Sequence, residues 1–388
     1  MGKEQVTSKD SRTTAQTPGL RPIESITPPQ ILEELKSGVL GQDTALKFVS
    51  VAIYKHTTGK VPGNIILIGN SGTGKTTIMN NIQRLYNEVP EYVPFRAMAI
   101  INANLLVDSD RLEFRPDRLL TAVEQRVRSV IRHPAAAEEL KAAMERATVC
   151  IDEIDKMSSI VAGKPNAIGV ALQQGLLTLM EGDIVPIRTH VMVDGQEKAA
   201  TIEIDTKGMM FMCGGAFEGL YDQVFARVTN PGSGQRLRSV AVRDASGQVT
   251  IETRFSLADY FKIEDLFQYG MLPQFIARLD NVVLLSDLDV DALKQILLVA
   301  LDSPFVRSRA YLEVMGIELQ IEDVAAAIVA EQAEKHSRTG ARALRAMFSK
   351  LINPIEFDPW NSGALEDTDT DRKRLLLTAS MVRRALGV

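Results

Sequence analysis

Residues 65–76 read IILIGNSGTGKT. Four apolar residues are followed at once by the octet Gly69 to Thr76, which fits the pattern G-x-x-x-x-G-K-[ST]. A helical pattern, TTIMNNIQRLY, continues from Thr76. In a strand–loop–helix context this pattern binds phosphate, because its glycines let backbone N–H groups close around the anion at a helix N-terminus. The stretch therefore predicts a P-loop.

The P-loop pattern assigns a role to each polar group. We expect Lys75 to reach the β- and γ-phosphates and Thr76 to offer its hydroxyl to Mg²⁺. ATP and Mg²⁺ are therefore the predicted cofactors. The predicted nucleotide contacts are Gly69, Asn70, Ser71, Gly72, Thr73, Gly74, Lys75, Thr76 and Thr77.

A second apolar run, residues 148–151, ends in Asp152 and Glu153. Two adjacent carboxylates at the end of a buried strand can be a solvated strand end, but beside a P-loop they suggest phosphoryl transfer. Asp152 is predicted to hold Mg²⁺, directly or through water, and Glu153 to orient the attacking water. The pair predicts hydrolysis as well as binding.

Strands and helices alternate along most of the chain. A third apolar run, MMFMC, covers 209–213, and DRLLTAVEQRVRSVI at 117–131 has helical periodicity. This order predicts an α/β fold with a parallel sheet between helices. Residues 190–205 and 239–255 read as hairpins.

From Asp289 the pattern is helical only, with one helix stopping at Pro354. We expect a disordered tail at 1–27, which lacks large apolar residues. A large ATPase domain at 28–287 and a small, mainly helical domain at 288–388 are predicted to follow.

Composition narrows the function classes. The chain has 44 Lys and Arg against 49 Asp and Glu, a net charge of −5, so it lacks the basic excess typical of proteins that wrap duplex nucleic acid. Cys150 and Cys213 both lie in apolar runs, which excludes a zinc cage or disulfide framework. Neither a signal-peptide core nor a run of about 18 apolar residues occurs, so we expect a cytoplasmic protein without a membrane partner.

With these motifs in place, the chain resembles the AAA+ ATPases, and among them the ClpX and HslU group of unfoldases, from about residue 28 to about 362. The resemblance rests on VLGQDTALKFVSVAIYKH (39–56), IDEIDKM (151–157), GVALQQGLLTLMEG (169–182), MFMCGGAFEGL (210–220), GMLPQFIARLD (270–280) and TGARALR (339–345).

The resemblance implies a homo-hexameric ring that remodels a protein client, directly or through an adaptor. It also implies that Val39 and Leu40 lie near the adenine, that Arg278 is an arginine finger and that Arg342 is the sensor of the small domain. Surface ion pairs are the alternative for both arginines. The polar sensor expected after the fourth strand has no candidate, because Cys213-Gly214-Gly215 carries no suitable side chain.

Several attachments of ClpX are missing. The tail has no zinc domain, and residues 108–120, DSDRLEFRPDRLL, replace the Gly-Tyr-Val-Gly pore motif. Phe114 is either the gripping aromatic or a core residue. The Arg-Lys-His loop is reduced to Arg188-Thr189-His190, which reads as part of a hairpin. Residues 230–239 lack the Ile-Gly-Phe docking tripeptide and offer Leu237 alone as an apolar anchor, so we expect action without the ClpP peptidase.

The residues are also compatible with two other functions. One is a nucleic-acid motor or loader whose ring is lined by Arg111, Arg115 and Arg118. The other is a nucleotide-dependent scaffold that does not hydrolyse ATP, against which Glu153 and Arg278 argue.

Overall fold

The computed structural model describes residues 21–388 except 60–62, 109, 112, 244–248, 301, 337–339 and 368–371; the side chains of 240–243 and 249–254 are also outside the description. The predicted tail therefore lies mostly outside the described residues. Its last part does not: Arg21 forms an ion pair with Glu91, and Ile26 is buried after a 3-10 turn, η1 (Ile23–Ser25). Packing thus begins before residue 28, where the tail was expected to end.

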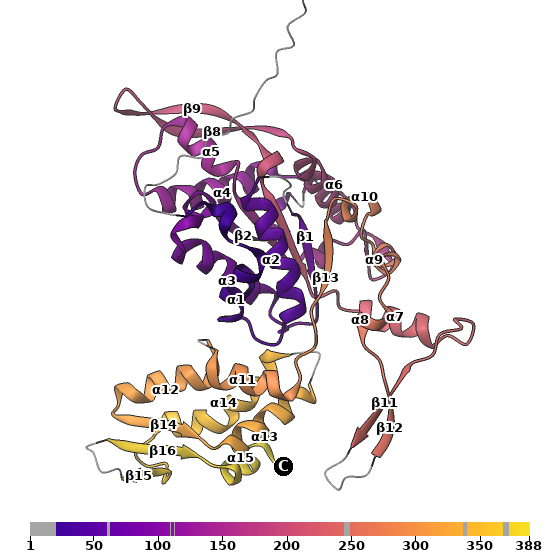
Figure 1. The fold of residues 1–388 in the computed structure, drawn as a ribbon, viewed down its shortest axis with the longest axis vertical. Helices are drawn as coiled ribbons and strands as arrows, with labels where there is room; N and C mark the ends of the chain where they lie inside the picture. Colours follow the sequence, from indigo (N-terminus) through magenta and orange to yellow (C-terminus); the bar gives the residue numbers. More distant parts are fainter. Residues whose placement is uncertain are drawn as a thin grey trace, which may run out of the picture.

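A five-stranded parallel sheet organises the first part of the chain, and the predicted α/β class is confirmed (Figure 1). Its strand order is β13-β1-β10-β5-β2. The strands are β1 (Ile65–Ile68), β2 (Met98–Asn102), β5 (Thr148–Asp152), β10 (Met210–Gly215) and β13 (Asn281–Leu284). The three predicted apolar runs are β1, β5 and β10.

Both faces of this sheet are covered, which explains why its strands are continuously apolar. Ile65 and Leu67 of β1 pack in one core cluster with α1 (Pro28–Lys36), α2 (Asp43–Thr57) and α3 (Lys75–Glu88). Ile66 and Ile68 point into a second cluster on the other face. The helices contributing buried residues there are α4 (Pro116–Ile131), α5 (Ala137–Met144), α6 (Ala167–Glu181), α7 (Leu220–Thr229), α9 (Ile263–Tyr269) and α10 (Pro273–Ile276).

Short elements and two hairpins complete the part of the chain before residue 288, which is called the large part below. The long hairpin β8 (Ile184–Val193) with β9 (Gln196–Asp205) turns at Asp194-Gly195, and Arg188-Thr189-His190 lies within β8. The second hairpin pairs β11 (Arg238–Arg243) with β12 (Val249–Arg254), so both predicted hairpins are confirmed. The short elements are η2 (Pro90–Phe95), η3 (Ala103–Leu106), β3 (Val107–Asp108), β4 (Glu113–Phe114), η4 (Ile154–Met157), β6 (Ile160–Val161), β7 (Lys164–Pro165), η5 (Thr206–Gly208) and α8 (Leu257–Tyr260).

The C-terminal part, called the small part below, has its own core, built from residues between Leu288 and Val382. The boundary at 287 stays a proposal, which this separate core supports. The helices are α11 (Val290–Val299), α12 (Pro304–Val314), α13 (Asp323–Glu334), α14 (Ala341–Phe357) and α15 (Ala379–Leu386).

Two expectations for this part are wrong. Residues after Asp289 are not helical only, because β14 (Ile317–Ile321), β15 (Leu365–Asp367) and β16 (Lys373–Leu377) form a three-stranded sheet. Their alternating buried residues were too few to outweigh the helical periodicity around them. Helix α14 also continues past Pro354 to Phe357, since Leu351, Ile352 and Ile355 are buried and hold that last turn against the core.

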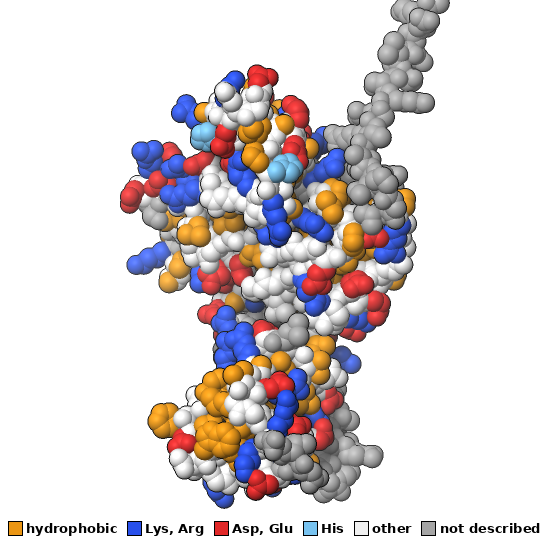
Figure 2. All heavy atoms as spheres, turned by 90° about the vertical axis from the view of Figure 1, so that its left-hand side faces the viewer, with side chains coloured by type: hydrophobic (Ala, Val, Ile, Leu, Met, Phe, Trp, Pro, Cys, Tyr) orange, Lys and Arg blue, Asp and Glu red, His pale blue; other side chains and the backbone are white. Residues whose placement is uncertain are grey.

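The surface carries charges of both signs. On the face drawn in Figure 2, basic and acidic side chains are interspersed over the large part. None of the helices in the described ranges combines the length and apolar character needed to cross a bilayer.

Candidate nucleotide site

The P-loop connects β1 to α3 in a backbone conformation that needs glycine. Gly72 and Gly74 have φ of 79° and 107°, in the left-handed region that side chains disfavour. Gly74 is the N-cap of α3, so the loop delivers the chain directly to a helix N-terminus. The predicted contact residues Ser71, Gly72, Gly74, Lys75, Thr76 and Thr77 line one cavity of about 1080 Å³.

Lys75 is buried inside this loop. Its Nζ donates hydrogen bonds to the carbonyl oxygens of Gly69, at 2.5 Å, and Asn70, at 2.9 Å. Burial lowers the pKa of the Lys75 ammonium, because desolvation disfavours its charged form. A phosphate bound in the loop would place further negative charge beside this ammonium and so favour its charged form.

Thr76 and Asp152 meet across the ends of β1 and β5. The Thr76 hydroxyl donates to Asp152 Oδ2 over 2.9 Å. A hydroxyl and a carboxylate are oxygen ligands of the kind Mg²⁺ prefers, and in nucleotide sites one or two such ligands are completed by phosphates and waters. The pair therefore fits Mg²⁺. No cluster of three or more His, Cys, Asp or Glu that could hold a metal occurs among the described residues.

Glu153 has an unusual backbone. Its φ of 60° lies in the left-handed region, where a residue other than glycine is strained. Its Oε2 accepts hydrogen bonds from Lys156 Nζ, at 2.8 Å, and from Asn102 Nδ2, at 2.6 Å. The hydrogen bond from Lys156, followed by that from Asn102, lowers the pKa of the Glu153 carboxyl. The carboxylate is thus held deprotonated beside the cavity.

The C-terminal part reaches the P-loop through the start of α14. The Ala341 N–H donates to the Gly72 carbonyl oxygen over 3.0 Å. A Cβ at Gly340 would lie 2.7 Å from the same oxygen, so the approach requires glycine. Arg342 follows and lines the same cavity as Lys75 and Glu153. Thr339 of the TGAR motif lies outside the described residues.

The segment predicted to lie near the adenine contacts the P-loop through Gln42. Val39 is buried in the core and Leu40 is half-buried, and neither lines the cavity. The next polar residue, Gln42, is buried and donates from Nε2 to the carbonyls of Thr73, at 3.0 Å, and Ser286, at 2.8 Å. Gln42 therefore ties the P-loop to the segment between β13 and α11.

Sequence reasoning missed several cavity residues. Asp155 accepts hydrogen bonds from the N–H groups of Ala216 and Phe217, both at 3.2 Å, and burial raises the pKa of its carboxyl. It links the turn after β5 to the turn after β10. Glu218 and Tyr269 also line the cavity. Asp155, the third acid of IDEID, was visible in the sequence, whereas nothing local marked Tyr269.

Arg278 lies away from this cavity. It follows α10 and forms an ion pair with Glu181 at the end of α6. Both side chains are about half exposed. Within its own chain this arginine is therefore not brought to the P-loop.

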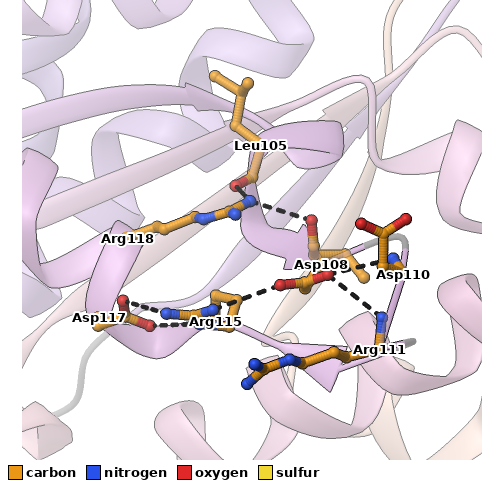
Figure 3. A network of polar contacts seen from close by, with 8 residues as sticks. Leu105, Asp108, Asp110, Arg111, Arg115, Asp117 and Arg118 are labelled. Atoms are coloured by element: carbon orange, nitrogen blue, oxygen red, sulfur yellow. Dashed lines mark hydrogen bonds and ion pairs between the residues drawn. The ribbon is translucent and has the colours of Figure 1, made fainter.

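The stretch that replaces the pore motif is held by internal contacts (Figure 3). Phe114 is half-buried and lies against Gly175 of α6. It packs against the core cluster that Ile66 and Ile68 enter, called the large core below. Arg115 contacts Asp117 and Asp108, and Arg118 donates to two backbone carbonyls. Of the two readings of Phe114, this geometry favours the core residue.

Comparison with known proteins agrees with these motifs. A family model described as "AAA domain (Cdc48 subfamily)" matches residues 60–282, more than half of the chain. The chain is 30% identical over 348 residues to the ATP-dependent Clp protease ATP-binding subunit ClpX of Porphyromonas gingivalis, covering 85% of this chain and 77% of that protein. It is 28% identical over 349 residues to the ClpX subunit of Bacteroides thetaiotaomicron, covering 85% and 77%.

Proposed function

Because this chain belongs to the ClpX-like AAA+ ATPases, we propose that it uses the energy of ATP hydrolysis to remodel or unfold protein clients. The family assigns the ATPase activity. The client class, the ring and the roles of single residues are parts of the proposal.

The observation that carries the proposal is the meeting of both parts of the chain at one cavity. Lys75 and Glu153 come from the large part and Arg342 from the small part, and the Ala341 N–H contacts the P-loop carbonyl of Gly72. A nucleotide bound there would touch groups from both parts. Its hydrolysis would change those contacts and with them the angle between the parts, which is how a rigid-body motion is driven.

Within this site each residue has a chemical task. Lys75 neutralises phosphate charge, and Thr76 with Asp152 would hold Mg²⁺, which supplies further neutralisation when bound. Glu153 orients and polarises water. Its two partners, Asn102 and Lys156, both donate to Oε2, so Oε1 can accept from that water.

A ring explains the position of Arg278. An arginine that does not reach its own cavity can act on the nucleotide of a neighbouring subunit, where it would stabilise charge on the transferred phosphoryl group. We propose a homo-hexamer, in which hydrolysis at each site depends on the neighbour being in place.

The same reasoning favours action without ClpP. Leu237, the one apolar candidate for a docking anchor in residues 230–239, is half-buried and packs against the large core. A side chain engaged in its own core cannot also fill a pocket on a partner. A peptidase would therefore need another surface of this chain.

The nucleic-acid reading is weaker than the protein reading. Arg115 is paired with Asp108 and Asp117, and Arg118 is bound to backbone carbonyls, so two of the three arginines invoked for it are already engaged. Their use on phosphates would require breaking these contacts. The scaffold reading conflicts with the ATPase activity of the family.

A stimulation screen tests the proposal. ATPase rates are measured with an unfolded protein, with single-stranded DNA and with RNA, each at 50 and 200 mM salt. We expect stimulation by the protein at both concentrations. Stimulation by DNA or RNA that collapses at the higher concentration would indicate a nucleic-acid motor instead, because phosphate contacts release counterions.

A further inference from the structure

We propose that Gln173 is the positioning residue of Arg278: its side chain fixes the start of α10, and α10 presents the arginine to the nucleotide of a neighbouring subunit. This inference rests on the proposed function, in which Arg278 acts on that neighbour. It adds a residue that lies outside the nucleotide cavity and acts through the arginine.

Gln173 lies on α6 and is fully buried. Its Nε2 donates to the carbonyl oxygens of Met157, at 2.9 Å, and Gly270, at 3.2 Å. Its Oε1 accepts from the Leu272 N–H at 2.7 Å. The amide group therefore uses both of its donors and its acceptor oxygen. Buried polar groups are normally paired in this way, so what distinguishes Gln173 is which segments its three bonds join.

The three bonds join the turn after β5 to the start of α10. Met157 is the last residue of η4, and Leu272 is the residue directly before α10. The same two segments also touch each other, because the Ser159 N–H donates to the Gly270 carbonyl oxygen at 2.8 Å. A Cβ at Gly270 would lie 2.2 Å from Ser158 Oγ, so this close approach requires glycine. Gln173 thus holds a tight junction between the nucleotide site and α10.

Helix α10 depends on such support because it is short. It has four residues, Pro273–Ile276, and no side chain caps its N-terminus. A single helical turn is not stable by itself. It lies beside α6 (Figure 1), and the Leu272 N–H bound to Gln173 sets where it begins. Arg278 follows two residues after the turn ends, so its position depends on that of the turn.

The ion pair of Arg278 does less to fix the arginine. It joins Arg278 to Glu181 through two side chains that are about half exposed. Exposed ion pairs contribute little to stability, so this contact can be exchanged for another when a neighbour is in place. The bond from Leu272 to Gln173 is part-buried, and its loss would leave the N–H unpaired. The stable attachment of the α10 segment is therefore at Gln173.

The first test compares Gln173→Met with Gln174→Met. Methionine has nearly the size of glutamine but makes none of the three bonds, and Gln174, the next residue on α6, is exposed and serves as the matched control. For Gln173→Met we expect kcat for ATP to fall roughly 10- to 100-fold with KM within about twofold of wild type, because a displaced arginine weakens charge stabilisation and leaves the P-loop intact. Assembly mass should be unchanged. Gln174→Met should behave as wild type, and wild-type kcat in Gln173→Met would overturn the inference.

Mixed rings then locate the defect. An active interface combines the P-loop of one chain with the arginine of its neighbour. Mixing Gln173→Met with Lys75→Ala should therefore restore activity to roughly threefold or more above the two chains alone, because the Lys75→Ala chain supplies a correctly placed arginine. Mixing Gln173→Met with Arg278→Ala should restore nothing, since neither chain supplies one.

The opposite pattern, recovery with Arg278→Ala alone, would place the defect in the chain's own nucleotide site and overturn the inference. Recovery with both partners or with neither would make Gln173 a structural residue, which also overturns it. If Gln173→Met does not assemble, Gln173→Glu replaces it in the same mixtures, because it keeps an acceptor for the Leu272 N–H. Failure of both variants to assemble would likewise show a structural role.

A reference mixture separates this inference from the proposed function. Arg278→Ala mixed with Lys75→Ala must recover activity if the arginine acts on a neighbour. If that mixture shows no recovery, the proposed action of Arg278 in a ring fails, and this inference fails with it. If it recovers and the Gln173→Met mixtures do not follow the expected pattern, the inference about Gln173 fails alone.

Discussion

The ring of Phe114 lies against Gly175, on the face of α6 that turns toward β4. A Cβ at position 175 would overlap the Phe114 ring carbons, so the glycine makes room for the aromatic side chain. The two residues form a packing pair. An aromatic held in this way is not available to grip a client.

From this packing pair we predict that Phe114 stabilises the folded chain. Phe114→Ala should lower the free energy of unfolding by about 2 kcal/mol, less than a fully buried phenylalanine because the ring is half-buried. Gly175→Ala should also destabilise, and the double variant with Phe114→Ala should lose less stability than the two single losses added together, since alanine lacks the Cγ and Cδ1 atoms that overlap most closely. Urea unfolding of the four proteins measures this. A fully stable Phe114→Ala that has lost client processing would restore the gripping role.

Hydrolysis should depend on Glu153 separately from binding. Glu153→Gln keeps the size of the side chain and one acceptor oxygen but replaces the other oxygen with an NH₂ donor and cannot polarise water as a carboxylate does, so turnover should fall by roughly 10²-fold or more with ATP binding retained. Lys75→Ala should instead weaken binding of a fluorescent ATP analogue. Phosphate release near the wild-type rate from Glu153→Gln would rule out the water-orienting role.

The position of Arg278 predicts complementation between subunits. Arg278→Ala and Lys75→Ala chains should each be nearly inactive alone, and mixing them should restore part of the ATPase, because some interfaces then combine an intact arginine with an intact P-loop. Glu181→Gln is the control, since it removes the ion-pair partner of Arg278 and leaves the arginine. If mixed rings are verified by mass and show no recovery at any ratio, Arg278 does not act in trans.

The buried His56 predicts an acid-dependent loss of stability. Its Nε2 lies 3.2 Å from the Arg146 carbonyl and its ring packs edge-on against Phe95. Burial lowers its pKa to about 4 from the usual 6.5. Between these values the unfolded chain binds a proton that the folded chain does not, so the stabilisation is complete above pH 6.5 and is lost as the pH falls.

The expected loss attributable to His56 is about 2 kcal/mol between pH 7.5 and pH 5. His56→Gln can still donate to the Arg146 carbonyl but does not titrate, so its stability should fall less over this range. His133→Gln, at an exposed histidine, should follow the wild type. The free energy of unfolding is measured in urea at each pH. If it falls equally with pH in wild type and in His56→Gln, His56 takes up its proton in the folded chain as well.

Much of the large part could be predicted because its strands carry strong local signals. β1, β5 and β10 are continuous apolar runs, each followed by a glycine or an acidic residue. The strand β13 was not predicted, since its four residues, Asn281–Leu284, follow a short helix without a turn signal of their own. β14 and β16 were missed because each has only five residues, and β14 also stands alone between two helices.

The sequence by itself determined the chemistry of the P-loop and of the Asp152-Glu153 pair, because adjacent residues set the turn, the helix start and the strand end through their own backbone preferences. Tertiary structure alone decided that Arg342 enters the cavity of Lys75, that Arg278 pairs with Glu181, and that the ring of Phe114 lies on Gly175. These contacts join segments far apart in the chain. Local preferences act over a few residues, whereas such contacts depend on how the whole core packs.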